Sequence, residues 1–237
     1  MNFRTIKQNS KDIISSSKPS PIAVALLYVA VTMLLSYLAG AVTSGNVTDS
    51  AMANIENYMV QGRYDYAITE YEKLMPSNTA VIIDCALQIV QQILSAGFII
   101  FLLHCVRKTG EACIANLLDG FAVAWRLILL YLLEGLFVFL WSLLLVAPGI
   151  IASYSYRQAV YILLDNPEIS PMECIRRSKA MMKGHKWQLF TFDLSFIGWY
   201  LLSMIPVAQI WTEPYIGISR ILYYEDLIKN TDSQDVI

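Results

Sequence analysis

The chain has 237 residues, of which 56% are apolar and 15% charged, with 17 basic and 19 acidic side chains. A soluble domain of this size usually carries about a quarter charged residues, so the composition argues against an ordinary soluble enzyme. The net charge of −2 also argues against a protein built to neutralise nucleic-acid phosphates, because such a protein has a basic excess.

Long apolar blocks indicate a membrane protein. An α-helix needs about 20 apolar residues to cross a hydrocarbon core about 30 Å thick. Three blocks reach this length: Pro21 to Val42, Thr79 to Leu103, and Phe121 to Ala147. Three more are shorter or interrupted: Ile150 to Leu164, Trp187 to Ile205, and Val207 to Tyr224. We predict an all-α polytopic bundle of six transmembrane helices, in which Ile150 to Leu164 is either a short span or a re-entrant segment.

Basic residues orient these helices. They gather before the first block, between the second and third, and between the fourth and fifth, which predicts three in-out-in hairpins with both termini in the cytoplasm. The predicted parts are a cytoplasmic segment 1–20, a first hairpin 21–103 with an external loop 43–78, a membrane domain of two hairpins 104–227, and a cytoplasmic tail 228–237. The first block is longer than the apolar stretch of a cleaved signal peptide, so we expect a retained helix. In the external loop the spacing predicts one or two short amphipathic helices, at Ser50 to Gln61 and Tyr64 to Met75.

The two later hairpins resemble each other. Trp141 stands seven residues before Pro148, and Trp199 stands seven before Pro206. A segment starting at Ser10 also resembles one starting at Ser178. These matches favour three tandem units, each with a surface helix before a hairpin, although chance similarity among apolar sequences is the alternative.

The segment from Ser170 to Gly184 has the signals of an interfacial amphipathic helix. Ser170 and Glu173 form a capping box, Pro171 suits the first turn, and Gly184 suits the end. We expect the apolar side to lie on the inner leaflet and the cations to contact anionic lipid headgroups. The predicted headgroup contacts are Arg176, Arg177, Lys179 and Lys183. A topology anchor without regulatory meaning is the simpler alternative to a docking site.

Ionisable residues inside the blocks are costly unless they are paired, so they are the candidate site residues. Depth along each helix predicts an outer cluster of Asp84, Arg157, Glu213 and Glu134, flanked by Tyr154 and Tyr161. An inner cluster comprises Arg126, Asp193 and Arg220. Either the charges pair to hold the bundle together, with Asp84 bound to Arg157, or they line a path for a solute or ion.

Catalytic and metal-binding templates find no match. The sequence has no H-E-x-x-H, G-x-S-x-G or P-loop motif and no C-x-x-C pair, and His104 and His185 stand alone. We therefore expect no enzymatic activity, no cofactor and no metal.

The second half of the chain, over about residues 110 to 227, contains a series of short motifs. The first motifs are Trp141, Pro148-Gly149-Ile150, Ser153-Tyr154-Ser155-Tyr156, Asp165-Asn166-Pro167, Ser178-Lys179 and Met182-Lys183-Gly184. The later ones are Lys186-Trp187, Leu194-Ser195-Phe196-Ile197-Gly198-Trp199, Pro214-Tyr215 and Tyr223-Tyr224-Glu225-Asp226-Leu227. In these motifs the chain resembles the domain-of-unknown-function family 975. The resemblance implies an integral membrane protein of a bacterial plasma membrane and supplies no catalytic residues.

The expected function is that of a membrane accessory or interaction protein, with lipids and a companion protein or peptide as partners, in peptide export, immunity or envelope stress. A transporter or channel component that uses the buried charges is the alternative. A continuous polar cavity joining the two clusters would favour transport, whereas a tightly packed bundle with an exposed apolar groove would favour partner binding.

Overall fold

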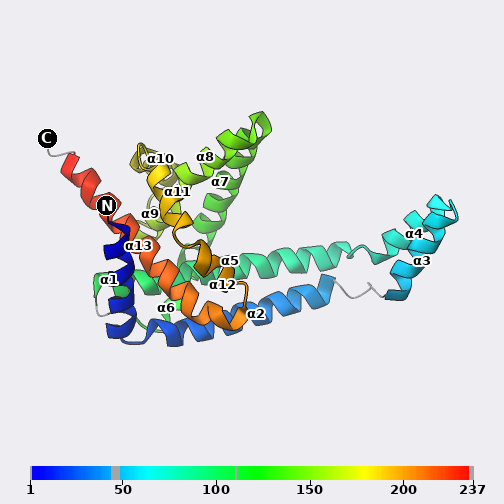
Figure 1. Cartoon of the computed structure of the whole chain (residues 1–237), viewed down its shortest axis with the longest axis horizontal. Helices are drawn as coiled ribbons and strands as arrows, with labels where there is room; N and C mark the ends of the chain where they lie inside the picture. The colour runs from blue at the N-terminus through cyan, green and yellow to red at the C-terminus, as the bar shows by residue number, and fades with distance from the viewer. Residues whose placement is uncertain (1, 44–48, 110, 235–237) are drawn as a thin grey trace. The chain divides into compact units, whose positions relative to one another are not determined.

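The computed structural model describes residues 2–43, 49–109 and 111–234, and this part of the chain is helical without a β-strand (Figure 1). It divides into two compact units, one formed by Met1–Val29 with Ile93–Ile237 and the other by Ala30–Gln92. Helices α2 and α5 each contribute to both. The all-α prediction is therefore confirmed for the described residues.

Three helical stretches are long and apolar enough to cross a membrane, at Pro21–Thr43, Asn78–Arg107 and Asn116–Leu144. They are α2 (Pro21–Thr43), α5 (Asn78–Arg107), and the run of α6 (Asn116–Asp119), the 3-10 turn η1 (Gly120–Val123) and α7 (Ala124–Leu144). They coincide with the three long apolar blocks, because only those blocks reach the length that a membrane span needs.

None of the three shorter apolar blocks, all within the described residues, forms one continuous α-helix. The fourth is split into α8 (Val146–Tyr156) and α9 (Ala159–Asp165), and the fifth into α11 (Lys186–Leu194) and α12 (Ile197–Leu202). The sixth begins with the 3-10 turn η2 (Pro206–Ala208) and continues as α13 (Gln209–Gln234), which contains Pro214. Each split leaves backbone groups without helical partners, so other parts of the chain must satisfy them.

The surface helices supply side chains at both splits. These helices are α1 (Phe3–Ser16) and α10 (Pro171–Met181). Ser178 of α10 donates its hydroxyl to the Ser155 carbonyl at 2.8 Å and accepts the Gln158 amide at 3.1 Å, which spans the gap between α8 and α9. Lys7 of α1 donates to the Ser195 carbonyl at 2.8 Å, between α11 and α12. The splits are thus defined features of the fold, stabilised from outside their own helices.

Each surface helix packs on the last helix of a hairpin. Helix α10 packs on α9, and α1 packs on α13 (Figure 1). Between α1 and α13, the Ser10 and Ser219 hydroxyls lie 2.8 Å apart. The α6–η1 turn lies so close to α5 that a Cβ atom on Gly120 would stand 2.1 Å from the Ile93 carbonyl oxygen. This recurring arrangement supports the predicted tandem units.

The orientation predicted for α10 is wrong in one respect. The side expected to face lipid is buried in the protein core instead, with Cys174 and Ser178 fully covered. Its apolar surface packs against α7, α8 and α9, so lipid is excluded from it. The cationic side is the exposed one. The capping prediction is confirmed, because Ser170 Oγ accepts the Glu173 amide and Gly184 ends the turn at a φ of 85°.

The predicted helices of the external loop are confirmed as α3 (Asp49–Val60) and α4 (Tyr64–Leu74). The two helices pack on each other. The Arg63 guanidinium lies over the Tyr66 ring, 4.0 Å from its centroid, at the turn between them. Residues 44–48 of this loop and 235–237 of the predicted tail lie outside the described residues.

Candidate functional site

The split between α8 and α9 places Arg157 at a cavity. Ser178 bonds to the backbone on both sides of Arg157, at Ser155 and Gln158, and so holds the split open. No described residue forms a hydrogen bond or ion pair with the Arg157 guanidinium, which lines two adjoining cavities. A guanidinium has five N–H donors, so this group is available to a ligand.

The larger cavity has a volume of about 480 Å³. Glu134 of α7 and Arg157 lie in its wall, and one Glu134 carboxylate oxygen is buried without a hydrogen-bond partner among the described residues. An unpartnered buried carboxylate oxygen is expensive. The remaining lining residues are Ile99, Tyr131, Gly135, Val138, Ser153, Tyr156, Val160, Tyr161 and Arg220.

The smaller cavity, of about 330 Å³, contains an ion pair. Arg220 of α13 lies 3.4 Å from the Asp193 carboxylate of α11, and it donates to the Tyr200 hydroxyl of α12 at 2.7 Å. Tyr200 in turn donates to Asp193 at 3.3 Å. Ser153, Tyr154 and Arg157 complete the lining. Arg220 is therefore neutralised by the protein itself, unlike Arg157.

The two cavities share Ser153, Arg157 and Arg220 in their walls. Glu134 and Arg157 come from the predicted outer cluster, whereas Asp193 and Arg220 come from the inner one. The polar surface thus runs between the two predicted clusters. With Arg220 paired to Asp193, one unpaired cation and one unpaired carboxylate remain.

Several predicted site residues have other surroundings. Glu213 lies about two turns before Arg220 on α13 and lines neither cavity. Arg126 does not join the inner cluster, because it donates to the Pro167 carbonyl and lies 3.7 Å from the Glu168 carboxylate. Asp84 accepts a hydrogen bond from Gln88 at 2.8 Å within the unit Ala30–Gln92. Its pairing with Arg157 would join the two units and stays a prediction.

The flanking tyrosines are placed as the sequence indicated. Tyr154 lines the smaller cavity and Tyr161 the larger one, one turn to either side of Arg157. Tyr200 was not among the predicted site residues, which were chosen for their charge and, at Tyr154 and Tyr161, for their distance from Arg157. The place of Tyr200 seven residues after Asp193, two turns along a helical block, is the signal that could have found it.

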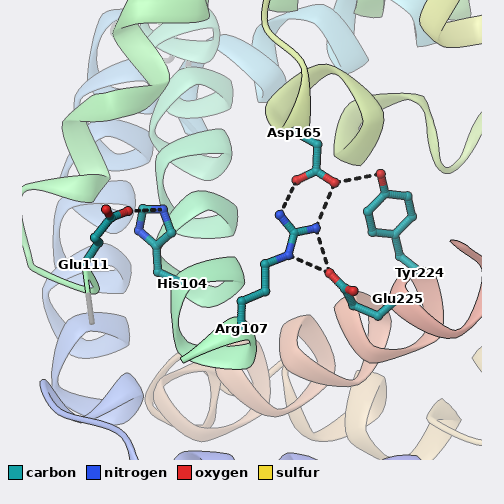
Figure 2. Close-up of polar contacts among 6 residues, drawn as sticks. All are labelled: His104, Arg107, Glu111, Asp165, Tyr224 and Glu225. Atoms are coloured by element: carbon teal, nitrogen blue, oxygen red, sulfur yellow. Dashed lines mark hydrogen bonds and ion pairs between the residues drawn. The ribbon is translucent and has the colours of Figure 1, made fainter. Parts of the chain in front are cut away.

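A second polar cluster supports the cavity wall from outside (Figure 2). Arg107, at the end of α5, binds both Asp165 oxygens at 2.8 and 2.9 Å and the Glu225 carboxylate at 2.7 Å. Tyr224 donates to Asp165 at 2.9 Å. The Tyr224 ring also stacks on Tyr161, with centroids 5.3 Å apart. The cluster therefore links α5, α9 and α13 behind a cavity-lining tyrosine. Sequence reasoning assigned Arg107 only to membrane orientation.

The predicted headgroup cations fall into two groups. Arg176 and Arg177 both bind Glu173 on their own helix, at 2.7 and 2.9 Å. These hydrogen bonds from Arg176 and Arg177 lower the pKa of Glu173 to about 2. Lys179 and Lys183 have no such partner among the described residues and line a groove of about 720 Å³.

Among the described residues, no group of three metal-ligating side chains is close enough to hold a metal ion. The polar groups of the cavity are thus a carboxylate, guanidinium groups, and hydroxyls, which bind ligands through charge and hydrogen bonds.

Comparison with known proteins finds a family match, in the second half of the chain. Residues 142–231 match the family described as "Protein of unknown function (DUF975)". The resemblance read from the sequence motifs is therefore confirmed over these residues. The matched region contains Arg157, Asp193 and Arg220, whereas Glu134 and Arg107 lie before it. Neither a curated protein nor a solved structure matches the chain.

Proposed function

We propose that the chain is a non-enzymatic, multi-pass protein of a bacterial plasma membrane, with six spans and both termini in the cytoplasm. Its three long apolar helices support membrane association. The basic segments before α2, after α5 and around α10 favour the cytoplasmic side. Ile6 of α1 and Leu227 of α13, near the two ends of the chain, belong to one buried cluster, which supports termini on the same side.

The function that the cavity supports best is the binding of a small zwitterionic molecule, as a component of a transporter. The observation that carries this proposal is that Glu134 and Arg157 line one cavity, where Glu134 Oε1 has no hydrogen-bond partner and Arg157 forms no hydrogen bond or ion pair with a described residue. A ligand with one cationic and one anionic group would satisfy both. Amino acids and short peptides have this chemistry.

The size and surroundings of the cavity agree with such a ligand. Small-molecule sites typically have volumes of about 300–1,000 Å³ and are mostly apolar with a few placed polar groups. The larger cavity, with about 480 Å³, lies in this range. Its wall offers Ile99, Val138 and Val160 beside the two charges. The continuation past Arg220 to Asp193 supports passage of the ligand between the two predicted clusters.

Thermal unfolding of the purified full-length chain in detergent tests this proposal. A ligand at about 100 times its dissociation constant stabilises the folded state by about 2.7 kcal/mol. We expect glycine or dialanine to raise the Tm, and we expect acetate and methylammonium, which carry one charge each, to leave it unchanged. Glu134→Gln and Arg157→Gln should each abolish the shift, whereas Glu168→Gln and Arg177→Gln, which alter exposed charges, should retain it. Equal shifts in all four variants would refute the proposal.

A second candidate function is that of an accessory protein that binds a companion protein or peptide. Helices α3 and α4 lie outside the candidate spans, yet they expose large apolar side chains. These side chains are Met52, Met59, Val60, Tyr64, Tyr66, Ile68 and Tyr71. An exposed apolar surface outside a membrane is typical of an interaction site. Peptide export, immunity and envelope stress are settings in which such binding would act.

Site-specific photo-crosslinking in cells tests this second function. A crosslinking residue at Tyr71, on α4, should give one discrete protein adduct. The same residue at Tyr37, exposed on the apolar helix α2, serves as the control and should react with lipid. If both positions give the same products, α3 and α4 have no dedicated partner.

A further inference from the structure

The groove beside α10 brings together cations from two helices, α10 and α11. Its lining comprises Arg176, Lys179, Ala180, Lys183, Gly184, Lys186 and Trp187. Arg176, Lys179 and Lys183 recur every three or four residues, so they share one face of α10. Lys186 and Trp187 begin α11.

The turn between the two helices creates this convergence. Gly184 has a φ of 85°, a conformation that residues with a Cβ atom rarely adopt. The turn is closed by hydrogen bonds from the Lys183 amide to the Ala180 carbonyl and from the His185 amide to the Met182 carbonyl. The chain consequently reverses within a few residues and brings Lys186 to the groove that Lys179 and Lys183 line.

The charge of the groove is not neutralised by the protein. Glu173 is occupied by Arg176 and Arg177, and no described residue pairs with Lys179, Lys183 or Lys186. Three ammonium groups without counter-charges at one groove suit an anion with several acceptor oxygens. A phosphate group has this chemistry.

An aromatic row connects the groove with the interior. Trp187 is 73% exposed and stacks on Phe190, with ring centroids 5.1 Å apart. Phe190 packs edge-on against Tyr154, which lines the smaller cavity. Tryptophan is enriched at membrane interfaces, where its ring meets lipid at the headgroup level. The groove therefore offers cations for a phosphate and an exposed aromatic ring for the lipid attached to it.

We propose that this groove is a discrete binding site for the phosphate of an anionic phospholipid headgroup, held by Lys179, Lys183 and Lys186 beside Trp187. The proposal rests on the proposed function only in that the chain lies in a membrane. It places the headgroup contact at the lysines and Trp187, with Arg176 and Arg177 held by Glu173. The apolar side of α10 takes no part, because the protein core covers it.

Binding of a short-chain phosphatidylglycerol to the purified full-length chain in detergent tests the proposal. We expect saturable binding, at least tenfold weaker binding of short-chain phosphatidylcholine, and no competition by inorganic phosphate at the same concentration. Each cation near an anionic lipid contributes a factor of about five in affinity, so replacing all three lysines with glutamine should weaken binding roughly 100-fold. The matched Lys→Arg triple variant should retain binding.

A control variant removes the same charge elsewhere. Arg4, Lys11 and Lys18 are exposed residues outside the groove, and their replacement by glutamine should leave binding unchanged. Equal binding by the groove variant and the wild type, or equal loss in the control, would overturn the proposal. If inorganic phosphate competes, the ligand of the groove is a soluble phosphate and the lipid proposal is wrong. In every case the groove variant should keep any glycine-induced stabilisation, which separates this site from the cavity.

Discussion

Ser178→Ala should destabilise the protein and loosen the split that presents Arg157. The Ser178 hydroxyl is fully buried and makes two hydrogen bonds, to the Ser155 carbonyl at 2.8 Å and from the Gln158 amide at 3.1 Å. Its removal leaves one buried acceptor and one buried donor unsatisfied. Each such group costs about 1–3 kcal/mol, so we expect the two together to lower the free energy of unfolding by about 2–6 kcal/mol.

Unfolding in detergent micelles with increasing dodecyl sulfate, followed by circular dichroism, measures this loss. Ser15→Ala is the matched control, because the Ser15 hydroxyl is exposed and donates only to the Asp12 carbonyl of its own helix. The control should change stability by less than about 0.5 kcal/mol. Hydrogen exchange of the Gln158 amide should also accelerate in Ser178→Ala. A loss no larger than that of the control, with unchanged exchange at Gln158, would refute this account of the split.

Three further predictions concern other parts of the fold. Gly120→Ala should destabilise the folded protein by about 3 kcal/mol or more in the same unfolding assay, because the new Cβ atom would stand 2.1 Å from the Ile93 carbonyl oxygen. Gly198→Ala is the control and should leave the stability unchanged, because there is open space around Gly198. Arg107→Lys should lower the free energy of unfolding by about 1–2 kcal/mol, because a lysine cannot form the two parallel hydrogen bonds to Asp165 at this partly exposed site. Arg176→Lys should change it by less than about 0.5 kcal/mol. The pKa of Glu173 is lowered from 4.5 to about 2, so its pairs stabilise α10 above pH 4.5 and are lost as the pH falls toward 2. Protection of the α10 amides against hydrogen exchange, relative to their intrinsic rate at each pH, should fall over this range in the wild type, whereas Glu173→Gln should show the same protection throughout.

The long helices and the caps could be predicted because they depend on local sequence. The length of the apolar blocks alone identifies α2, α5 and α7. The spacing of residues in the loop between the first two blocks indicates α3 and α4. The capping residues Ser170 and Gly184 act within a few positions of their own backbone. These features need no knowledge of how the helices pack.

The partners of the buried charges could be predicted only in part. The depth of a residue along its helix follows from counting residues, and on this basis Asp193 and Arg220 were correctly predicted to lie close together. Rotation about each helix axis and the splits in the shorter blocks do not follow from counting. Arg126 therefore binds the loop at Pro167 and Glu168 instead of the inner cluster. The Arg107 cluster was missed because Asp165 and Glu225 stand far from it in sequence, at the ends of other helices.

The proposed function depends on a polar cavity that reaches Arg157 from solvent and binds a zwitterion. Its most direct test is the reaction of Ser153→Cys with a small methanethiosulfonate reagent, in a chain whose exposed Cys85 and Cys113 are replaced by serine. Ser153 lines both cavities, so we expect rapid labelling in the folded protein, slowed by glycine or dialanine and not slowed by acetate. The slowing should disappear in Arg157→Gln. A thiol at position 153 that reacts no faster than the background, or whose labelling is insensitive to zwitterions, would contradict the proposed function.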